Sequence, residues 1–131
     1  MKKSIALATA AALFAAPVMA ETIKLGVLLG FTGPIESLTP DMAAGAEMAM
    51  AEASKSGKFM GGSTIESVRG DSTCVDAAAA TATAERLITS DKVVAIMGAD
   101  CSGVTTAVLQ NVATAKGVVM ISPSATSPAL S

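Results

Sequence analysis

The sequence predicts an α/β fold, an open parallel sheet with flanking helices. After residue 20, short apolar runs alternate with longer segments whose apolar residues recur at helical spacing. Repeated strand–helix alternation is typical of right-handed βαβ units. Two of the runs, VVAIM at 93–97 and VVMI at 118–121, are wholly apolar. This composition is expected of strands that are covered on both faces.

Four strands are expected. The first is IKLGVLL at 23–29, and the second is residues 64–68, where TIESV alternates and predicts a more exposed face. The apolar runs at 93–97 and 118–121 supply the third and fourth.

Three helices are expected between these strands, at 41–54, 75–88 and 102–116, with Ser102 able to cap the third. Each has an apolar residue at every third or fourth position. The predicted inner face of the first helix is Met42, Ala46, Ala49 and Ala53. That of the second is Ala77, Ala80, Ala84 and Leu87, and that of the third is Val104, Val108, Val112 and Ala115. Ser127 and Pro128 are typical of another helix start. We therefore interpret residues 21–131 as the N-terminal part of a larger α/β unit rather than a whole domain.

The first 20 residues have the pattern of a signal peptide. Lys2 and Lys3 precede an apolar run at 5–16, and Val-Met-Ala at 18–20 has small residues at the spacing of a cleavage site. A membrane anchor is the alternative, but a spanning helix needs about 20 apolar residues. No cysteine follows the cleavage point, so a lipoprotein is not indicated. We expect an exported mature chain that begins at Glu21.

Composition argues against several kinds of function. Nine Lys and Arg stand against 11 Asp and Glu, for a formal net charge of −2, and removing Lys2 and Lys3 makes the chain more acidic. There is no basic patch and there are only three phenylalanines, so nucleic acid is not an expected partner. Histidine, the commonest general base and metal ligand, is absent. We predict no metal and no cofactor.

The two cysteines, Cys74 and Cys101, are expected to form one disulfide in an exported protein, and two free thiols are the alternative. Closing this loop would contribute about 3–4 kcal/mol. An enzyme must also be considered, because Ala99-x-Cys101-x-Gly103 resembles a nucleophile elbow between a strand and a helix. That cysteine would need a base, and the sequence has no histidine.

The candidate binding site lies at the carboxyl ends of the strands, which share one edge of a parallel sheet. The segments that follow the four strands are 30–34, 71–74, 98–103 and 122–126, all rich in small and hydroxyl residues. Such residues at helix starts favour an anion such as a carboxylate. The alternative is that they are only caps and turn formers. The glycines lack the G-x-G-x-x-G spacing of a dinucleotide site.

Five motifs resemble type I periplasmic binding proteins, above all the leucine/isoleucine/valine-binding branch that serves branched-chain amino acid ABC transporters. They are IKLGVLLGFTGP, GAEMAMAEAS, DSTC, GADCSG and ISPSATSPAL. The resemblance covers residues 21–131. It implies a two-lobed, non-catalytic protein of the periplasm that closes on an amino acid or amide and delivers it to a membrane permease, with residues 21–131 as the N-terminal part of ligand-binding lobe 1. We expect the protein to be a monomer.

The resemblance also implies roles for individual residues. Ser102, after the second cysteine, would hold the ligand carboxylate, and Ser124, Ala125 and Thr126 would contact its polar head. The family often has an aromatic residue over the ligand in the first loop, whereas Leu38 stands nearest here. Two other functions stay open: the ligand-sensing domain of a receptor, and a cysteine hydrolase or glutaminase-type enzyme that uses Cys101.

Overall fold

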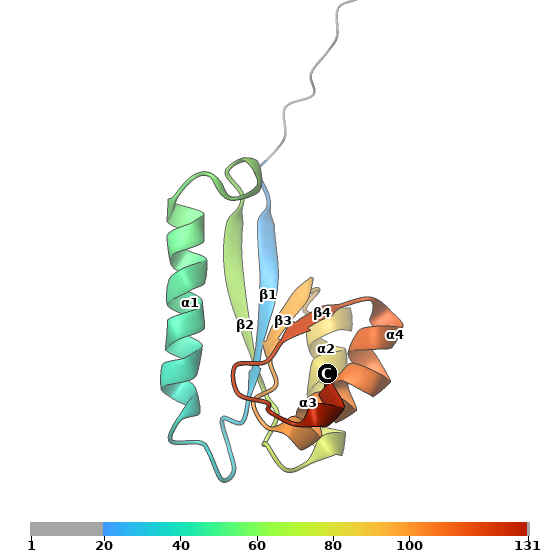
Figure 1. Ribbon diagram of the computed structural model, residues 1–131. Coiled ribbons are helices and arrows are strands. Elements are labelled where there is room, and N and C mark those ends of the chain that lie inside the picture. The colour runs from blue at the N-terminus through green and yellow to red at the C-terminus, as the bar shows by residue number, and fades with distance from the viewer. Residues whose placement is uncertain (1–19, 131) are drawn as a thin grey trace, which may run out of the picture.

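The computed structural model describes residues 20–130 and contains the predicted parallel sheet with helices on both faces (Figure 1). Its strands are β1 (Thr22–Leu29), β2 (Thr64–Asp71), β3 (Ala95–Gly98) and β4 (Val119–Ile121). All strand pairs are parallel. The predicted signal peptide lies outside the described residues, apart from Ala20.

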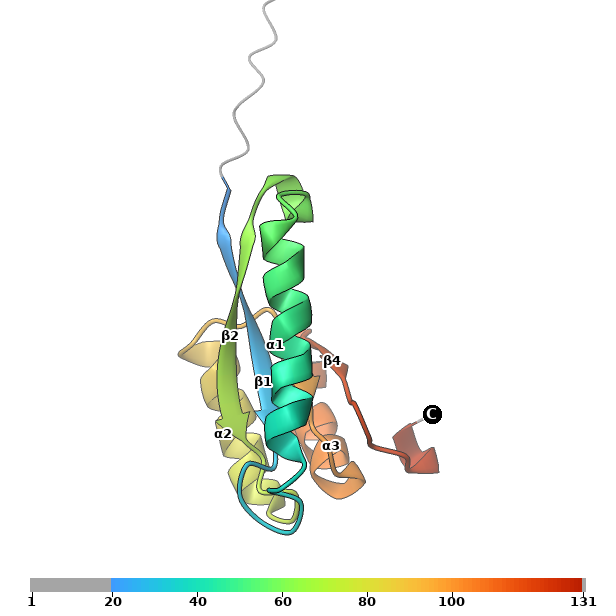
Figure 2. The same ribbon diagram turned by 90° about the vertical axis from the view of Figure 1, so that its left-hand side faces the viewer.

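The strand order is β2-β1-β3-β4, so the chain reverses its direction across the sheet between β1 and β3. Helix α1 (Thr39–Lys55) lies over β1 and β2 on one face. Helices α2 (Ala77–Thr89) and α3 (Ser102–Val108) lie on the opposite face (Figures 1 and 2). In open α/β sheets ligands bind at such a reversal, outside the carboxyl ends of the strands.

The central strand β1 is buried on both faces, which accounts for its nearly continuous apolar sequence. Val27 and Leu29 belong to the small core beneath α1, and Leu28 belongs to the larger core beneath α2 and α3. All three side chains are completely buried. Successive side chains of a strand point to opposite faces, so this one run joins the two layers.

The predicted inner faces of the helices are correct in part. Ala80, Ala84 and Leu87 of α2 are buried, but Ala77 is exposed. In α1, Ala49 is exposed and Ala43 is the fully buried alanine.

The third predicted helix is continuous from residue 102 to 116, but it contains a π-helical segment. Its parts are α3, the segment Leu109–Ala113 and α4 (Thr114–Lys116). The wider π turn shifts the helix face, because it adds a residue to the turn. Ala113 is therefore buried and the predicted Ala115 is exposed. The two other short helices, Phe59–Gly61 and Pro128–Leu130, are 3₁₀ turns.

Within residues 20–130, the prediction that the third and fourth strands are covered on both faces holds in part for β3 and is wrong for β4. In β3, Ile96 lies in the larger core and Met97 packs against the smaller one. The third begins only at Ala95, and Val94 before it is 60% exposed. In β4, Val119 is 64% and Ile121 69% exposed. These two side chains line an apolar groove together with Met50 and Met97, on the face where α1 lies over β1 and β2. Within the described residues, no helix is long and apolar enough to cross a membrane.

Candidate functional site

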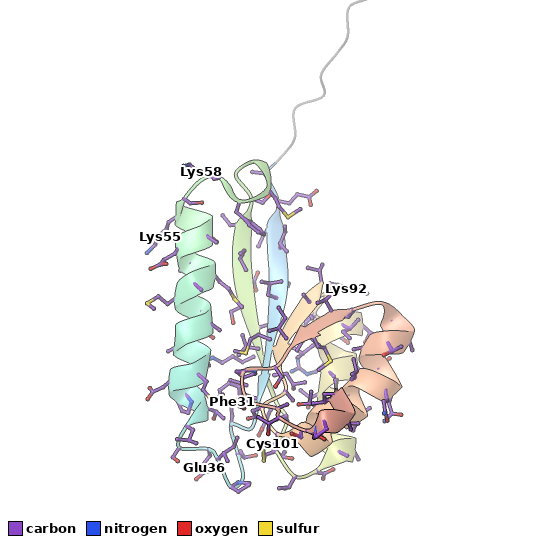
Figure 3. The ribbon with its side chains drawn as sticks, in the orientation of Figure 1. Phe31, Glu36, Lys55, Lys58, Lys92 and Cys101 are labelled. Atoms are coloured by element: carbon purple, nitrogen blue, oxygen red, sulfur yellow. A yellow bond between two sulfur atoms is a disulfide. The ribbon has the colours of Figure 1, made fainter. Side chains whose placement is uncertain are left out.

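The four segments that follow the strands lie together at one end of the molecule. Figure 3 places Phe31, Glu36 and Cys101 at this end, whereas Lys55 and Lys58 lie at the other. The topology explains the arrangement, because the carboxyl ends of parallel strands share one edge. Four separate parts of the sequence therefore contribute to a single polar surface.

Ser102 joins the third and fourth segments directly. Its Oγ accepts hydrogen bonds from the backbone N–H groups of Thr126, at 3.0 Å, and Ser127, at 3.2 Å. The expected capping role is wrong: Cys101 is the N-cap residue of α3, with no side-chain cap, and Ser102 is the first helical residue. The hydroxyl and two N–H groups thus converge on one point beside a helix start, where partial positive charge favours an anion.

The turn after β4 is anchored to the third segment by its serines. Ser122 Oγ donates to the carbonyl oxygen of Ala99 and accepts from Ala125 N–H at 2.9 Å. Ser124 Oγ donates to the carbonyl oxygen of Asp100 at 2.8 Å. Sequence reasoning placed Ser102, Ser124, Ala125 and Thr126 in one site, and the structure brings all four together at this edge.

Leu38 lies immediately before α1, at the N-cap position, and is 60% exposed. The next residue, Thr39, fixes the start of the helix because its buried Oγ1 donates to Gly30 O at 3.1 Å. Being apolar, Leu38 takes no part in the hydrogen-bond network of the other predicted site residues. Its exposed side chain is available for an apolar contact.

The structure contains the predicted disulfide, between Cys74 and Cys101, whose Cα atoms are 5.2 Å apart. It connects the loop after β2 to the start of α3, one residue before Ser102. A sulfur in a disulfide is not a thiolate, so Cys101 is no nucleophile in this state.

Asp71 has a role that sequence reasoning missed. Its carboxylate accepts a hydrogen bond from Thr32 Oγ1 at 2.6 Å and others from the N–H groups of Thr32 and Thr73, at 3.3 and 2.8 Å. Burial alone would raise the pKa of Asp71, but these hydrogen bonds hold it below its usual value. Asp71 thereby fastens the first loop to the second.

Phe31 is fixed in the first loop by a charged pair. The Arg69 guanidinium lies 5.3 Å from the centroid of the Phe31 ring, within the range of a cation–π contact. Arg69 also makes two hydrogen bonds to Glu47, at 2.7 and 2.8 Å, and they are the main reason why the pKa of Glu47 is lowered. Sequence reasoning assigned no role to Phe31, which precedes the Thr-Gly-Pro turn.

Asp100 is a further residue whose role sequence reasoning missed. Its side chain is only 2% exposed and accepts three hydrogen bonds, from Gly30 N–H, Ser72 Oγ and its neighbour Cys101 N–H. A carboxylate directly after a buried strand and before a helix was a signal that it lies at the site edge. Its partners were not predictable, because Gly30 and Ser72 lie 70 and 28 residues away in the sequence.

Within residues 20–130 no group of three His, Cys, Asp or Glu side chains is arranged to hold a metal ion. What the edge offers instead is hydroxyl groups, backbone N–H groups and an apolar side chain. Such a set can bind the polar head of a small organic molecule.

Comparison with known proteins gives consistent matches. A family model described as periplasmic binding protein matches residues 22–131. A Leu/Ile/Val-binding protein homolog from Brucella melitensis is 39% identical over 102 residues, which are 78% of this chain and 25% of that protein. The chain therefore spans about a quarter of the length of this curated relative.

Solved structures are similar as well. The branched-chain amino acid transporter substrate binding protein LivJ from Streptococcus pneumoniae, in complex with isoleucine, has 36% identity and a TM-score of 0.74. The match covers 83% of this chain and 30% of LivJ. A solute binding protein from Rhodopseudomonas palustris, in complex with 4-hydroxybenzoate, has 28% identity and a TM-score of 0.70, over 83% of this chain and 28% of that one.

Proposed function

Because this chain belongs to the periplasmic binding protein family, we propose that it forms part of the substrate-binding component of a branched-chain amino acid ABC transporter. Its ligand is a branched-chain amino acid or a related small amino acid or amide, captured between two lobes and delivered to a membrane permease. The protein is exported to the periplasm by residues 1–20, which are then cleaved off, and it acts as a monomer and binds without catalysis.

The convergence on Ser102 carries this proposal. Two backbone N–H groups point at its Oγ, which leaves its own O–H free to donate. A ligand carboxylate at this position would receive hydrogen bonds from the Ser102 hydroxyl and from N–H groups beside the start of α3. Hydrogen bonds to a charged group contribute about 1.5–3 kcal/mol each.

The ligand identity is proposed from the relatives. LivJ, whose name and complex are those of a branched-chain amino acid binder, is the structure described above with the higher identity. The relative with 4-hydroxybenzoate is less similar but also carries a carboxylate ligand. The polar edge accounts for the carboxylate, and the exposed Leu38 supports an aliphatic side chain next to it.

The test is calorimetric titration of the full-length protein with leucine, isoleucine, valine, small amides and 4-hydroxybenzoate. Ser102→Ala should weaken binding of the active compound by about 10- to 100-fold, since it removes one hydrogen bond to a charge. Thr126→Val should also weaken it.

Ser56→Ala and Thr81→Val are matched controls, because the hydroxyls of the exposed Ser56 and the half-buried Thr81 make only local contacts, at the end of α1 and within α2. Unchanged affinity in both site variants would refute the site. If the wild-type protein bound none of these compounds, the transport function would be wrong.

The receptor alternative shares every feature of this edge, and a membrane-spanning helix elsewhere in the full-length protein would favour it. The enzyme alternative requires a free Cys101 thiol. Alkylation without reductant would label Cys101 in that case and leave it unlabelled if the disulfide is present.

A further inference from the structure

The buried carboxylate of Asp100 connects three strand ends. Its Oδ2 accepts the N–H of Gly30, after β1, at 2.6 Å. Its Oδ1 accepts Ser72 Oγ, after β2, at 3.1 Å, and the N–H of Cys101, at the start of α3, at 2.9 Å. No other acidic side chain among residues 20–130 is fully buried.

The backbone around Asp100 extends the same connection to the fourth segment. Its carbonyl oxygen accepts the Ser124 hydroxyl, and the preceding carbonyl, of Ala99, accepts the Ser122 hydroxyl. Ser102, two residues along the chain, accepts from Thr126 N–H. Every segment of the candidate site is therefore held, directly or through one residue, by the position of Asp100.

We infer that Asp100 is a positioning residue of the ligand site, one that sets the start of α3 and Ser102 relative to the first and second loops. This inference rests on the proposed ligand-binding function. Asp100 itself is buried behind the edge and does not contact the ligand. Its effect reaches the ligand through the Cys101 and Gly30 backbone.

The chemistry of the side chain makes this inference specific. A carboxylate presents acceptors on both oxygens, whereas the asparagine amide presents one acceptor and one donor group. In Asp100→Asn, either Gly30 N–H or the pair Ser72 and Cys101 would face an N–H group. Two donors at such a separation repel, so at least one strand end must move.

The test compares Asp100→Asn with a core variant that destabilises the same lobe away from the site. Val112→Ala serves as this control, because Val112 is 2% exposed in the π-helical segment. Affinity of the full-length protein for isoleucine, or for whichever compound of the panel binds, is measured by calorimetry well below the melting temperature of each variant.

Asp100→Asn is expected to weaken binding at least tenfold, and Val112→Ala is expected to leave the affinity within twofold of wild type despite a comparable loss of melting temperature. Amide hydrogen exchange should be accelerated at Gly30 in Asp100→Asn alone. Affinity within twofold of wild type in Asp100→Asn, or an equal loss of affinity in Val112→Ala, would overturn the inference.

If Asp100→Asn does not fold, Ser72→Ala tests the inference instead, because it removes one of the three hydrogen bonds to the Asp100 side chain and leaves Asp100 itself unchanged. A loss of affinity of threefold or more in Ser72→Ala supports the inference, and unchanged affinity overturns it. If the wild-type protein bound no compound of the panel, the proposed function would be wrong. If the wild-type protein bound normally and Asp100→Asn had no effect on the affinity, only the inference about Asp100 would be wrong.

Discussion

At the scale of single residues, an added methyl group has opposite consequences at two glycines. Gly98 has φ +137°, and a Cβ there would lie 2.0 Å from Leu28 O. Gly98→Ala is therefore expected to destabilise the protein by about 3 kcal/mol or more. Gly45 lies within α1, and a Cβ there would meet nothing within 4 Å. Gly45→Ala is expected to stabilise by about 0.5–1 kcal/mol. Urea unfolding of both variants checks the pair, and shifts of equal sign would contradict it.

The lowered pKa of Asp71 predicts how the stability of the protein depends on pH. Its pKa is lowered in the folded protein, so its charged form stabilises the fold at pH values above its unfolded pKa of about 3.9. That stabilisation is lost as the pH falls through the lower, folded pKa. The melting temperature of Asp71→Asn should therefore be lower than that of wild type at pH 7. The difference between the two melting temperatures should become smaller as the pH falls towards 3. Thermal scans across this range test the expectation, and a difference independent of pH would refute it.

At the scale of elements, the disulfide is expected to stabilise the connection between the loop after β2 and α3. Loop-closure entropy for a separation of 27 residues corresponds to about 3–4 kcal/mol. The double variant Cys74→Ala with Cys101→Ala should lose stability on this scale in denaturant unfolding. Reductant should lower the stability of wild type but not of the double variant. Equal sensitivity of both proteins to reductant would argue against the disulfide as the cause.

The elements themselves were largely predictable, and the departures have local causes. Apolar runs identified the four strands and helical spacing identified the three main helices, because each pattern reflects which residues of that element are buried. The phase of the third helix changed at the π-helical segment, which apolar spacing cannot reveal. The exposure of Val119 and Ile121 was mispredicted for another reason. Their apolar character predicted that a neighbouring element buries them, and no described element does so.

At the scale of the whole molecule, the uncovered face of β3 and β4 predicts association. A polypeptide limited to residues 21–131 should self-associate and bind a hydrophobic dye, because Val119 and Ile121 lie exposed on an edge strand. Replacing both by threonine should reduce both effects. Val75→Thr is the control, since Val75 is 71% exposed but lies outside the sheet. Size-exclusion chromatography with dye fluorescence measures the outcome, and monomeric behaviour of the unmodified polypeptide would contradict it.

The position of the candidate site could be predicted from the topology, whereas the hydrogen bonds within it could not. Hydroxyl residues after consecutive strands indicated the edge, and Ser102 with the 124–126 turn were chosen from family resemblance. The carboxylates of Asp71 and Asp100 were not assigned because their partners come from distant parts of the sequence. A hydrogen bond between residues 70 apart leaves no periodic pattern.

The bond between Gly30 and Asp100 also has a consequence for the order of assembly. A chain that emerges with its N-terminus first can pair β1 with β2 early, because α1 is the main connection between them. The buried acceptor of Gly30 N–H lies 70 residues further along the sequence, beyond the end of β2, so this hydrogen bond cannot form together with the β1–β2 pairing. Until β3 docks, Gly30 N–H lacks the partner that it has in the folded protein, so the loop after β1 is not yet held by Asp100. Completion of the edge is therefore a late event in folding, coupled to the arrival of the third strand.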